Sequence, residues 1–103
     1  MSDAKPNTLV EIERQVVSLF ADGVRVAGLP RSVGEIYGLL FVSAEPLAMD
    51  DLVVRLNISK GSVSQGLKFL RTLGAIREVE GPDVRRTYYE GDIELKKLVG
   101  GFI

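Results

Sequence analysis

The sequence contains no cysteine and no histidine, and each absence removes a class of chemistry. Without cysteine the chain can form neither a disulfide nor a thiolate metal site, which fits a reducing compartment. Without histidine it lacks the commonest general base and metal ligand. No nucleophile–base pair, calcium-loop spacing or phosphate-binding glycine loop is found in the sequence. We therefore expect a protein that is not an enzyme and that uses no cofactor or metal.

Long hydrophobic runs are also missing. No apolar stretch approaches the roughly 18 residues of a membrane-spanning helix, and the N-terminus lacks a cationic start followed by an apolar core. The expectation is a cytoplasmic protein without a membrane partner. The 103 residues are 46% hydrophobic, which allows one domain with one modest core.

The most informative stretch, ISKGSVSQGLKFLRTLG, runs from Ile58 to Gly74 and predicts one helix. Ser59 is a good N-cap because its hydroxyl can accept a hydrogen bond from a free backbone N–H of the first turn. Gly74 follows the last apolar residue, where a left-handed closing residue favours glycine. Apolar residues at helical spacing form the expected buried stripe: Val63, Leu67 and Leu70.

The opposite face of this helix has cations and hydrogen-bonding side chains but no carboxylate. It comprises Gly61, Gln65, Lys68 and Thr72, with Lys60, Ser62, Ser64 and Arg71 on the flanks. A helix that faces only solvent usually mixes Glu with Lys. An acid-free face favours a polyanion such as DNA, and a plain solvated helix is the alternative.

The charge is unevenly distributed, although the net charge is −1. From Asn57 to Tyr89 there are six cations and three anions, whereas the remainder has seven cations and eleven anions. A phosphate responds to the local field within about 10 Å. The positive part of the chain coincides with the helix described above.

The N-terminal part predicts a helix from about Leu9 to Asp22. Thr8 and Glu11 have the spacing of a capping box, Gly23 is expected to end the helix, and residues 23–30 form a linker. Apolar residues cover more of this helix than one flank of a small domain requires. We expect one stripe to meet a second subunit, with packing across its own core as the alternative. The expected dimerisation residues are Leu9, Ile12, Val16 and Phe20, together with Leu95 and Leu98 near the C-terminus.

Two further helices are predicted before the helix at 58–74. Ser32 and Glu35 repeat the capping-box spacing before a helix of about 33–42, in which Gly34 and Gly38 allow close approach of another helix. A shorter helix, about 49–56, starts at Ala48, which cannot supply a side-chain cap. Two such helices joined by a short turn, here at 57–58, make a helix-turn-helix.

After Gly74 the pattern predicts strands at 75–80 and 85–90 joined by a turn. Tyr88 and Tyr89 alternate, so one is expected to pack on the core. Asp92 is the expected cap of a last helix, about 93–99. The fold class is therefore mainly α with a small β-hairpin (α+β): a winged helix-turn-helix with an N-terminal and a short C-terminal helix. Residues 1–31 form the expected dimerisation arm, 32–91 the DNA-binding domain, and 92–103 the start of a C-terminal helix. The apolar ending of that helix indicates either a longer parent protein or a helix that needs a partner.

From Gly28 to Asp92 the sequence resembles the GbsR-type branch of the MarR-like winged-helix transcriptional regulators. The most specific parts are GLPRSVGEIYGLL (28–40) and ISKGSVSQGL (58–67). The resemblance implies a homodimer that represses by occupying a double-stranded DNA operator, with a small-molecule effector of unknown identity. The chain departs from the branch at Ala48, where Ser or Thr is usual, at Phe69, where a polar residue is usual, and after Ile103, where long helices usually follow.

The expected DNA contacts lie mainly on the helix at 58–74, whose N-terminal N–H groups and dipole favour phosphate. Gln65 and Lys68 could reach base edges, Gln to adenine and Lys to guanine. Of Arg85 and Arg86, one is expected to reach a phosphate or the minor groove, with protection of an edge strand as the alternative. Arg31 is either a phosphate clamp or a plain surface residue. The full predicted set is Arg31, Ser59, Lys60, Gly61, Ser62, Ser64, Gln65, Lys68, Arg85 and Arg86.

The predicted function is a sequence-specific DNA-binding transcriptional regulator that acts as a repressor. The alternative is a winged helix that serves as a protein-interaction module without DNA binding.

Overall fold

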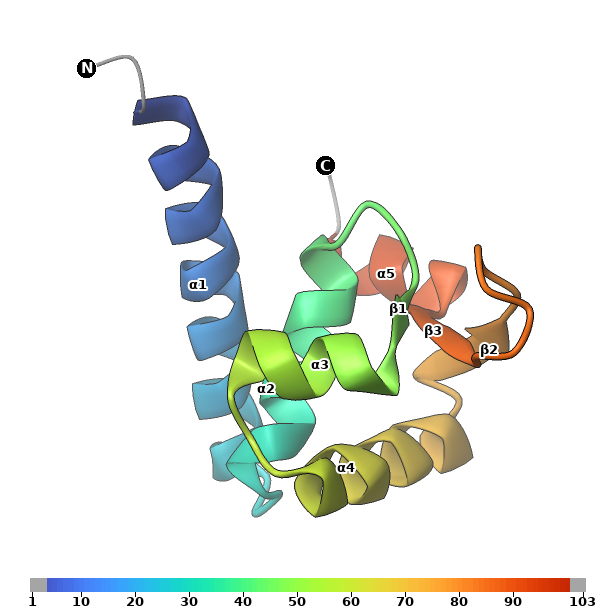
Figure 1. The fold of residues 1–103 in the computed structure, drawn as a ribbon. Helices are drawn as coiled ribbons and strands as arrows, with labels where there is room; N and C mark the ends of the chain where they lie inside the picture. The colour runs from blue at the N-terminus through green and yellow to red at the C-terminus, as the bar shows by residue number, and fades with distance from the viewer. Residues whose placement is uncertain (1–3, 101–103) are drawn as a thin grey trace.

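The computed structural model describes residues 4–100, and side chains from Val10 onward. In this part of the chain a small antiparallel sheet with strand order β1-β3-β2 lies at one edge of the helices (Figure 1). This arrangement confirms the predicted winged helix-turn-helix. The elements are α1 (Ala4–Val26), α2 (Arg31–Val42), β1 (Leu47–Ala48), α3 (Met49–Leu56), α4 (Lys60–Leu73), β2 (Ile76–Val79), β3 (Tyr88–Gly91) and α5 (Ile93–Gly100). None of the described helices has the length and apolar character to span a membrane.

The predicted ends of the first helix are wrong. α1 begins at Ala4, so the Thr8–Glu11 pattern lies inside it, and it continues through Gly23 to Val26. A glycine inside a helix costs only about 1 kcal/mol relative to alanine, which tertiary contacts easily offset. The chain turns instead at Gly28, whose φ of 82° lies in the left-handed region.

The predicted capping box of the second helix is also wrong. α2 begins at Arg31, with Pro30 at the N-cap and no side-chain cap. The predicted close approach is confirmed: a Cβ at Gly34 would lie 2.2 Å from the carbonyl oxygen of Phe20 in α1. The two helices therefore pack with backbones nearly in contact, and Figure 1 shows α1 lying along α2.

The helix-turn-helix agrees closely with the sequence pattern. Ala48 supplies no side-chain cap to α3, and its own backbone N–H donates to Oδ2 of Asp51 at 2.9 Å. Asn57 closes α3 with a left-handed φ of 56°. Ser59 caps α4 and Gly74 ends it at φ 78°, both as predicted.

The sheet differs from the prediction in two ways. β1 was not predicted, and it pairs Ala48 with Tyr88. The predicted second strand, 85–90, begins only at Tyr88, because the 80–87 segment forms a loop that we call the wing loop. Tyr88 and Tyr89 are both buried, and one of them, Tyr89, belongs to the core, which confirms the prediction that one of the pair packs there. Tyr89 joins the core, whereas the ring of Tyr88 lies against Gly81 at the base of the wing loop.

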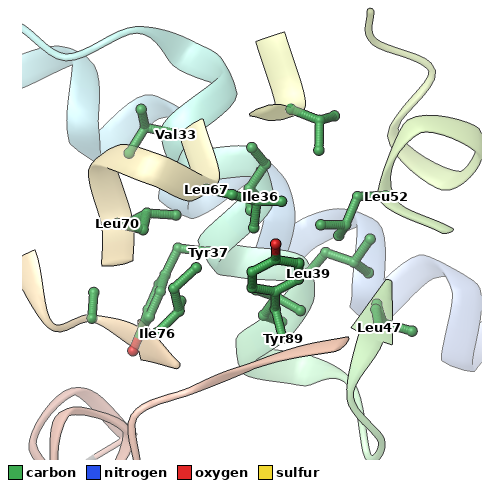
Figure 2. Close-up of a cluster of buried hydrophobic side chains, with 13 residues drawn as sticks. Val33, Ile36, Tyr37, Leu39, Leu47, Leu52, Leu67, Leu70, Ile76 and Tyr89 are labelled. Atoms are coloured by element: carbon green, nitrogen blue, oxygen red, sulfur yellow. The ribbon is translucent and has the colours of Figure 1, made fainter. Parts of the chain in front are cut away.

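The core forms where α2, α3, α4 and the sheet converge (Figure 2). Its largest fully buried side chains are Ile36, Leu39, Leu52 and Val63. Asp92 caps α5, as predicted, by accepting from the backbone N–H of Leu95 at 3.1 Å. The core packing holds one side of α4 and leaves the opposite side of the helix exposed to solvent.

Candidate nucleic-acid interface

α4 is oriented as its sequence predicts. Its buried stripe is Val63, Gly66, Leu67 and Leu70. Gly66 lets Ile36 of α2 approach so closely that a Cβ there would lie 2.4 Å from Cδ1. The exposed side carries the predicted contacts and neighbours: Lys60, Gly61, Ser64, Gln65, Lys68 and Thr72. The hairpin covers none of these side chains, and we call this side the outer face of α4.

The N-terminal end of α4 is capped by Ser59. Oγ of Ser59 accepts from the backbone N–H of Ser62 at 3.1 Å and donates to Oγ of Ser62 at 3.0 Å. The first-turn N–H groups next to this cap lack helical partners, and the first turn contains no acidic residue. The end of the helix therefore offers donors and a positive dipole to an anion.

The cations on α4 are not equivalent. Within the described residues, Lys60 and Lys68 have no carboxylate within ion-pair distance. Arg71 by contrast pairs with Glu78 of β2. Its charge is thus partly neutralised and links α4 to the sheet, whereas the charges of the two lysines face solvent.

The two flanks of α4 differ in chemistry. On the side toward α3 and the sheet, a shallow hollow is lined by Met49, Ser64, Leu67, Lys68, Arg71 and Tyr89. On the other side, Phe69 is 37% exposed and Leu73 is 62% exposed. Phe69 therefore lies near the exposed side, as the sequence indicated, and forms an apolar margin to the polar outer face.

Arg85 and Arg86 do not alternate along a strand, so the predicted geometry is wrong for both. They lie in the wing loop, where local hydrogen bonds to side chains take the place of the backbone hydrogen bonds between β2 and β3. Arg85 is 87% exposed, and its Nε lies 3.2 Å from Oδ1 of Asp83. The backbone N–H of Arg85, and next its side chain, hydrogen-bond to Asp83 and hold the pKa of that carboxyl below its usual value. Val84 beside it is 94% exposed.

Arg86 and Arg31 are both engaged by carboxylates. Nη2 of Arg86 lies 3.9 Å from Asp50 and 3.8 Å from Asp51, in the first turn of α3. Nη1 of Arg31 lies 3.1 Å from Asp22, and its Nε lies 3.5 Å from Glu35. Arg85 also pairs with a carboxylate, but its side chain is 87% exposed, against 50% for Arg31 and 36% for Arg86.

No protein-family model matches the sequence. Two curated proteins of Bacillus subtilis (strain 168) are similar to it. The HTH-type transcriptional repressor GbsR is 26% identical over 87 residues, which cover 84% of this chain and 48% of GbsR. The putative HTH-type transcriptional regulator YvaV is 24% identical over 86 residues, which cover 82% of this chain and 49% of YvaV. The chain thus spans about half the length of these relatives.

Solved structures share the arrangement of elements. A transcriptional regulator matches with a TM-score of 0.73 and 24% identity, over 80% of this chain and 56% of that one. A MepR variant from S. aureus, bound to an oligodeoxyribonucleotide, matches with a TM-score of 0.62 and 18% identity, over 97% and 72%. The chain has the fold of MarR-like winged-helix transcriptional regulators. In that fold, α4 is the second helix of the helix-turn-helix and the 80–87 loop is the wing.

The residues predicted for dimerisation of this winged helix divide into two groups. Phe20 and Leu95 pack against the core of their own chain, and the ring of Phe20 lies 5.2 Å from that of Tyr37. Ile12 and Leu98 are exposed and Val16 is half-buried, whereas the side chain of Leu9 lies outside the described residues. Of the predicted residues whose side chains are described, Ile12, Val16 and Leu98 therefore remain available to a partner.

Sequence reasoning missed the partners of the wing arginines and one buried group. Within residues 4–100, the Tyr37 hydroxyl is the buried side-chain polar atom that lacks a hydrogen-bond partner. Burial, and next the charge of Asp92, raise the pKa of Tyr37 above its ordinary value. In the same part of the chain no cluster of three acidic side chains could hold a metal ion.

Proposed function

We propose that this chain is the DNA-binding part of a transcriptional regulator that recognises a specific double-stranded sequence and acts as a repressor. One observation supports this proposal most strongly. The outer face of α4 is exposed and acid-free, and it presents Lys60 and Lys68 without carboxylate partners in the described structure. A B-DNA major groove is wide enough to admit such a helix.

The side chains of α4 have distinct roles in this proposal. The free N–H groups after Ser59 contact a phosphate at the edge of the groove, and Gly61 lets the backbone approach. Gln65 and Lys68 lie on the outer face and read base edges, where one good bidentate contact contributes about 1–3 kcal/mol of discrimination. Lys60 adds a sequence-independent phosphate contact, and the ammonium of Lys68 also neutralises phosphate charge beside the base that it reads.

The wing loop supplies a second contact through Arg85. Its guanidinium lies at the exposed tip beside Val84 and is held by Asp83. An arginine in this position can enter the minor groove or reach the backbone beside the major-groove site. Arg31, which pairs with Asp22 and Glu35, is removed from the proposed contact set.

Repression follows from occupancy of the DNA and requires no catalytic step. The relatives described above are named as regulators, and GbsR is named as a repressor. Occupancy of an operator excludes other proteins from the same DNA. The proposed site of action is accordingly the cytoplasm.

We also propose that the regulator is a homodimer formed in part through α1. Ile12, Leu19 and Val26 recur every seven residues, so they fall within about 40° of one another on the helix. All three are exposed, and Gly23 beside them has nothing within 4 Å of a Cβ position. Such a stripe suits a second helix. A two-fold dimer places its two recognition helices about 34 Å apart, one turn of DNA.

A second candidate function is a protein-interaction module without DNA binding. The exposed Phe69 and Leu73 on one flank of α4 favour it, since an apolar margin suits a protein partner. DNA binding is preferred because the outer face of α4 presents Lys60 and Lys68 without carboxylate partners in the described structure. The two functions differ in their response to salt, because phosphate contacts release counterions and apolar contacts do not.

Selection of bound duplexes from a random pool tests the proposal. We expect enrichment of a near-palindromic site with half-site centres about 10 base pairs apart. The matched control is the double variant Lys60→Glu, Lys68→Glu, which keeps the fold because both side chains are exposed. Equal recovery with the wild-type protein and the control variant, with no enriched sequence, would overturn DNA recognition by α4.

A further inference from the structure

Arg86 differs from the neighbouring Arg85 in its surroundings. Only 36% of the Arg86 side chain is exposed, and its guanidinium carbon lies 5.5 Å above the centre of the Tyr88 ring. Two carboxylates, Asp50 and Asp51, lie within 4 Å of Nη2. A guanidinium between two carboxylates and an aromatic ring is already neutralised and stacked.

The carboxylates that face Arg86 both come from the start of α3. Asp50 and Asp51 lie in its first turn, where the helix dipole favours negative charge. Asp51 divides its two oxygens: Oδ2 accepts from the backbone N–H of Ala48, and Oδ1 faces Arg86. Arg86 therefore contacts one carboxylate that a backbone hydrogen bond holds in place, Asp51, and one that is 77% exposed, Asp50.

In the described part of the chain, the other hydrogen bonds and ion pairs of the wing loop stay within the loop and its own strands. The last ladder pair is Val79 with Tyr88, and residues 80–87 extend beyond it. The hydrogen bonds from Arg85 and Arg86 to Asp83 fix the internal shape of the loop. Among the described residues, the Arg86 ion pairs are the polar contacts that join this loop to another helix.

We propose that Arg86 is a positioning residue that fixes the wing loop against α3 and thereby presents Arg85 to DNA. It binds no phosphate itself. This inference deepens the proposed DNA-binding function and depends on it. A loop held in its bound orientation loses less conformational freedom on binding, so the Arg86 contacts raise affinity without adding a DNA contact.

The test compares Arg86→Met with the matched variant Arg85→Met, since both remove one charge and keep a long side chain. Binding to the selected duplex is measured over a range of salt concentrations, and the wing amides of the free protein are followed by 15N relaxation. The salt slope is the change in the logarithm of the binding constant with the logarithm of the salt concentration. For Arg86→Met we expect about three- to tenfold weaker binding, an unchanged salt slope and lower order parameters at 80–87. For Arg85→Met we expect unchanged order parameters and a slope smaller by about 0.9.

Two results would overturn the proposal. One is a salt slope that falls in Arg86→Met as much as in Arg85→Met, which would make Arg86 a phosphate contact. The other is wing amides that stay as rigid as in the wild-type protein. If Arg86→Met does not fold, Arg86→Lys replaces it, because one ammonium cannot span both carboxylates and stack on Tyr88. Wing amides that are more mobile in Arg86→Lys than in the wild-type protein support the proposal, and wing amides of unchanged mobility contradict it. If the wild-type protein binds no duplex, the proposed function fails, while the relaxation data still test the role of Arg86.

Discussion

The hydroxyl of Ser59 stabilises α4 and lies where DNA phosphate is proposed to bind, and two substitutions separate these roles. Ser59→Ala removes the acceptor of the Ser62 N–H and should cost about 1 kcal/mol of unfolding free energy. Ser59→Asp keeps an acceptor and should fold as stably as the wild-type protein, but its charge repels phosphate. Urea unfolding and duplex titration measure the two effects. DNA binding by Ser59→Asp at wild-type strength would remove this helix end from the interface.

The Tyr37 hydroxyl is buried without a hydrogen-bond partner, so its effect is on the pH dependence of the unfolding free energy rather than on DNA binding. Because its pKa in the folded protein is above the ordinary value of 10.0, the unfolded chain loses this proton first. The stability of the folded protein is therefore unaffected by this proton below about pH 10 and falls as the pH rises through the folded pKa. Tyr89, whose pKa is raised mainly by burial, acts in the same direction.

Tyr37→Phe should therefore change stability differently in neutral and alkaline solution. At neutral pH we expect no loss, or a gain of up to about 1 kcal/mol, because an unpaired polar group leaves the core. Above about pH 10 the variant should lose less stability than the wild-type protein. Urea unfolding at several pH values measures both effects, and Tyr89 accounts for the alkaline loss that remains. A neutral-pH loss above about 1 kcal/mol would show that the hydroxyl has a partner.

Between elements, the contact of α1 with α2 depends on Gly34. A Cβ there would lie 2.6 Å from the carbonyl carbon of Phe20 and 2.7 Å from Cα of Ala21, so the backbone of α1 would have to move. We expect Gly34→Ala to destabilise the protein by about 1–3 kcal/mol or more. Gly61→Ala is the control, since its nearest neighbour is Ser59 Oγ at 4.0 Å, and it should be neutral or slightly stabilising. Equal melting temperatures for the two variants would contradict this packing.

The elements also show which parts of the fold the sequence could predict. Both ends of α4 were predictable because Ser59 and Gly74 are strong local signals at the positions they control. β1 was not, because a two-residue strand has no pattern of its own and forms only where β3 offers an edge. The ends of α1 were misplaced because Gly23 is a weak local signal that distant packing overrides.

The candidate site likewise has features that the local sequence predicts and features that depend on contacts formed only on folding. The outer face of α4 follows from helical periodicity and is oriented as predicted. The state of Arg86 depends on Asp50 and Asp51, which are distant in sequence and meet the wing only in the folded chain. Arg31 is tied to Asp22 at the end of α1 in the same way. Charge composition alone cannot distinguish such paired arginines from free ones.

In the whole molecule, the proposed dimer predicts an effect of the α1 stripe on assembly. Leu19 is 70% exposed, so Leu19→Glu should leave the monomer folded and weaken association, because a charge enters an apolar contact. Val54→Glu on α3 is the control, since that side chain is also exposed and lies on another helix. Sedimentation equilibrium at micromolar concentration compares them. A wild-type chain that stays monomeric would contradict dimerisation through α1 in this part of the protein.

The central claim is that the outer face of α4 lies against DNA phosphate and base edges, and one measurement tests it most directly. The salt dependence of binding to the selected duplex is compared for the wild-type protein, Lys68→Ala and Lys97→Ala. Lys97 is an exposed cation on α5, away from α4 (Figure 1). We predict that Lys68→Ala weakens binding and reduces the salt slope by about 0.9, whereas Lys97→Ala leaves both unchanged. An unchanged slope in Lys68→Ala, or an equal reduction in both variants, would contradict the claim.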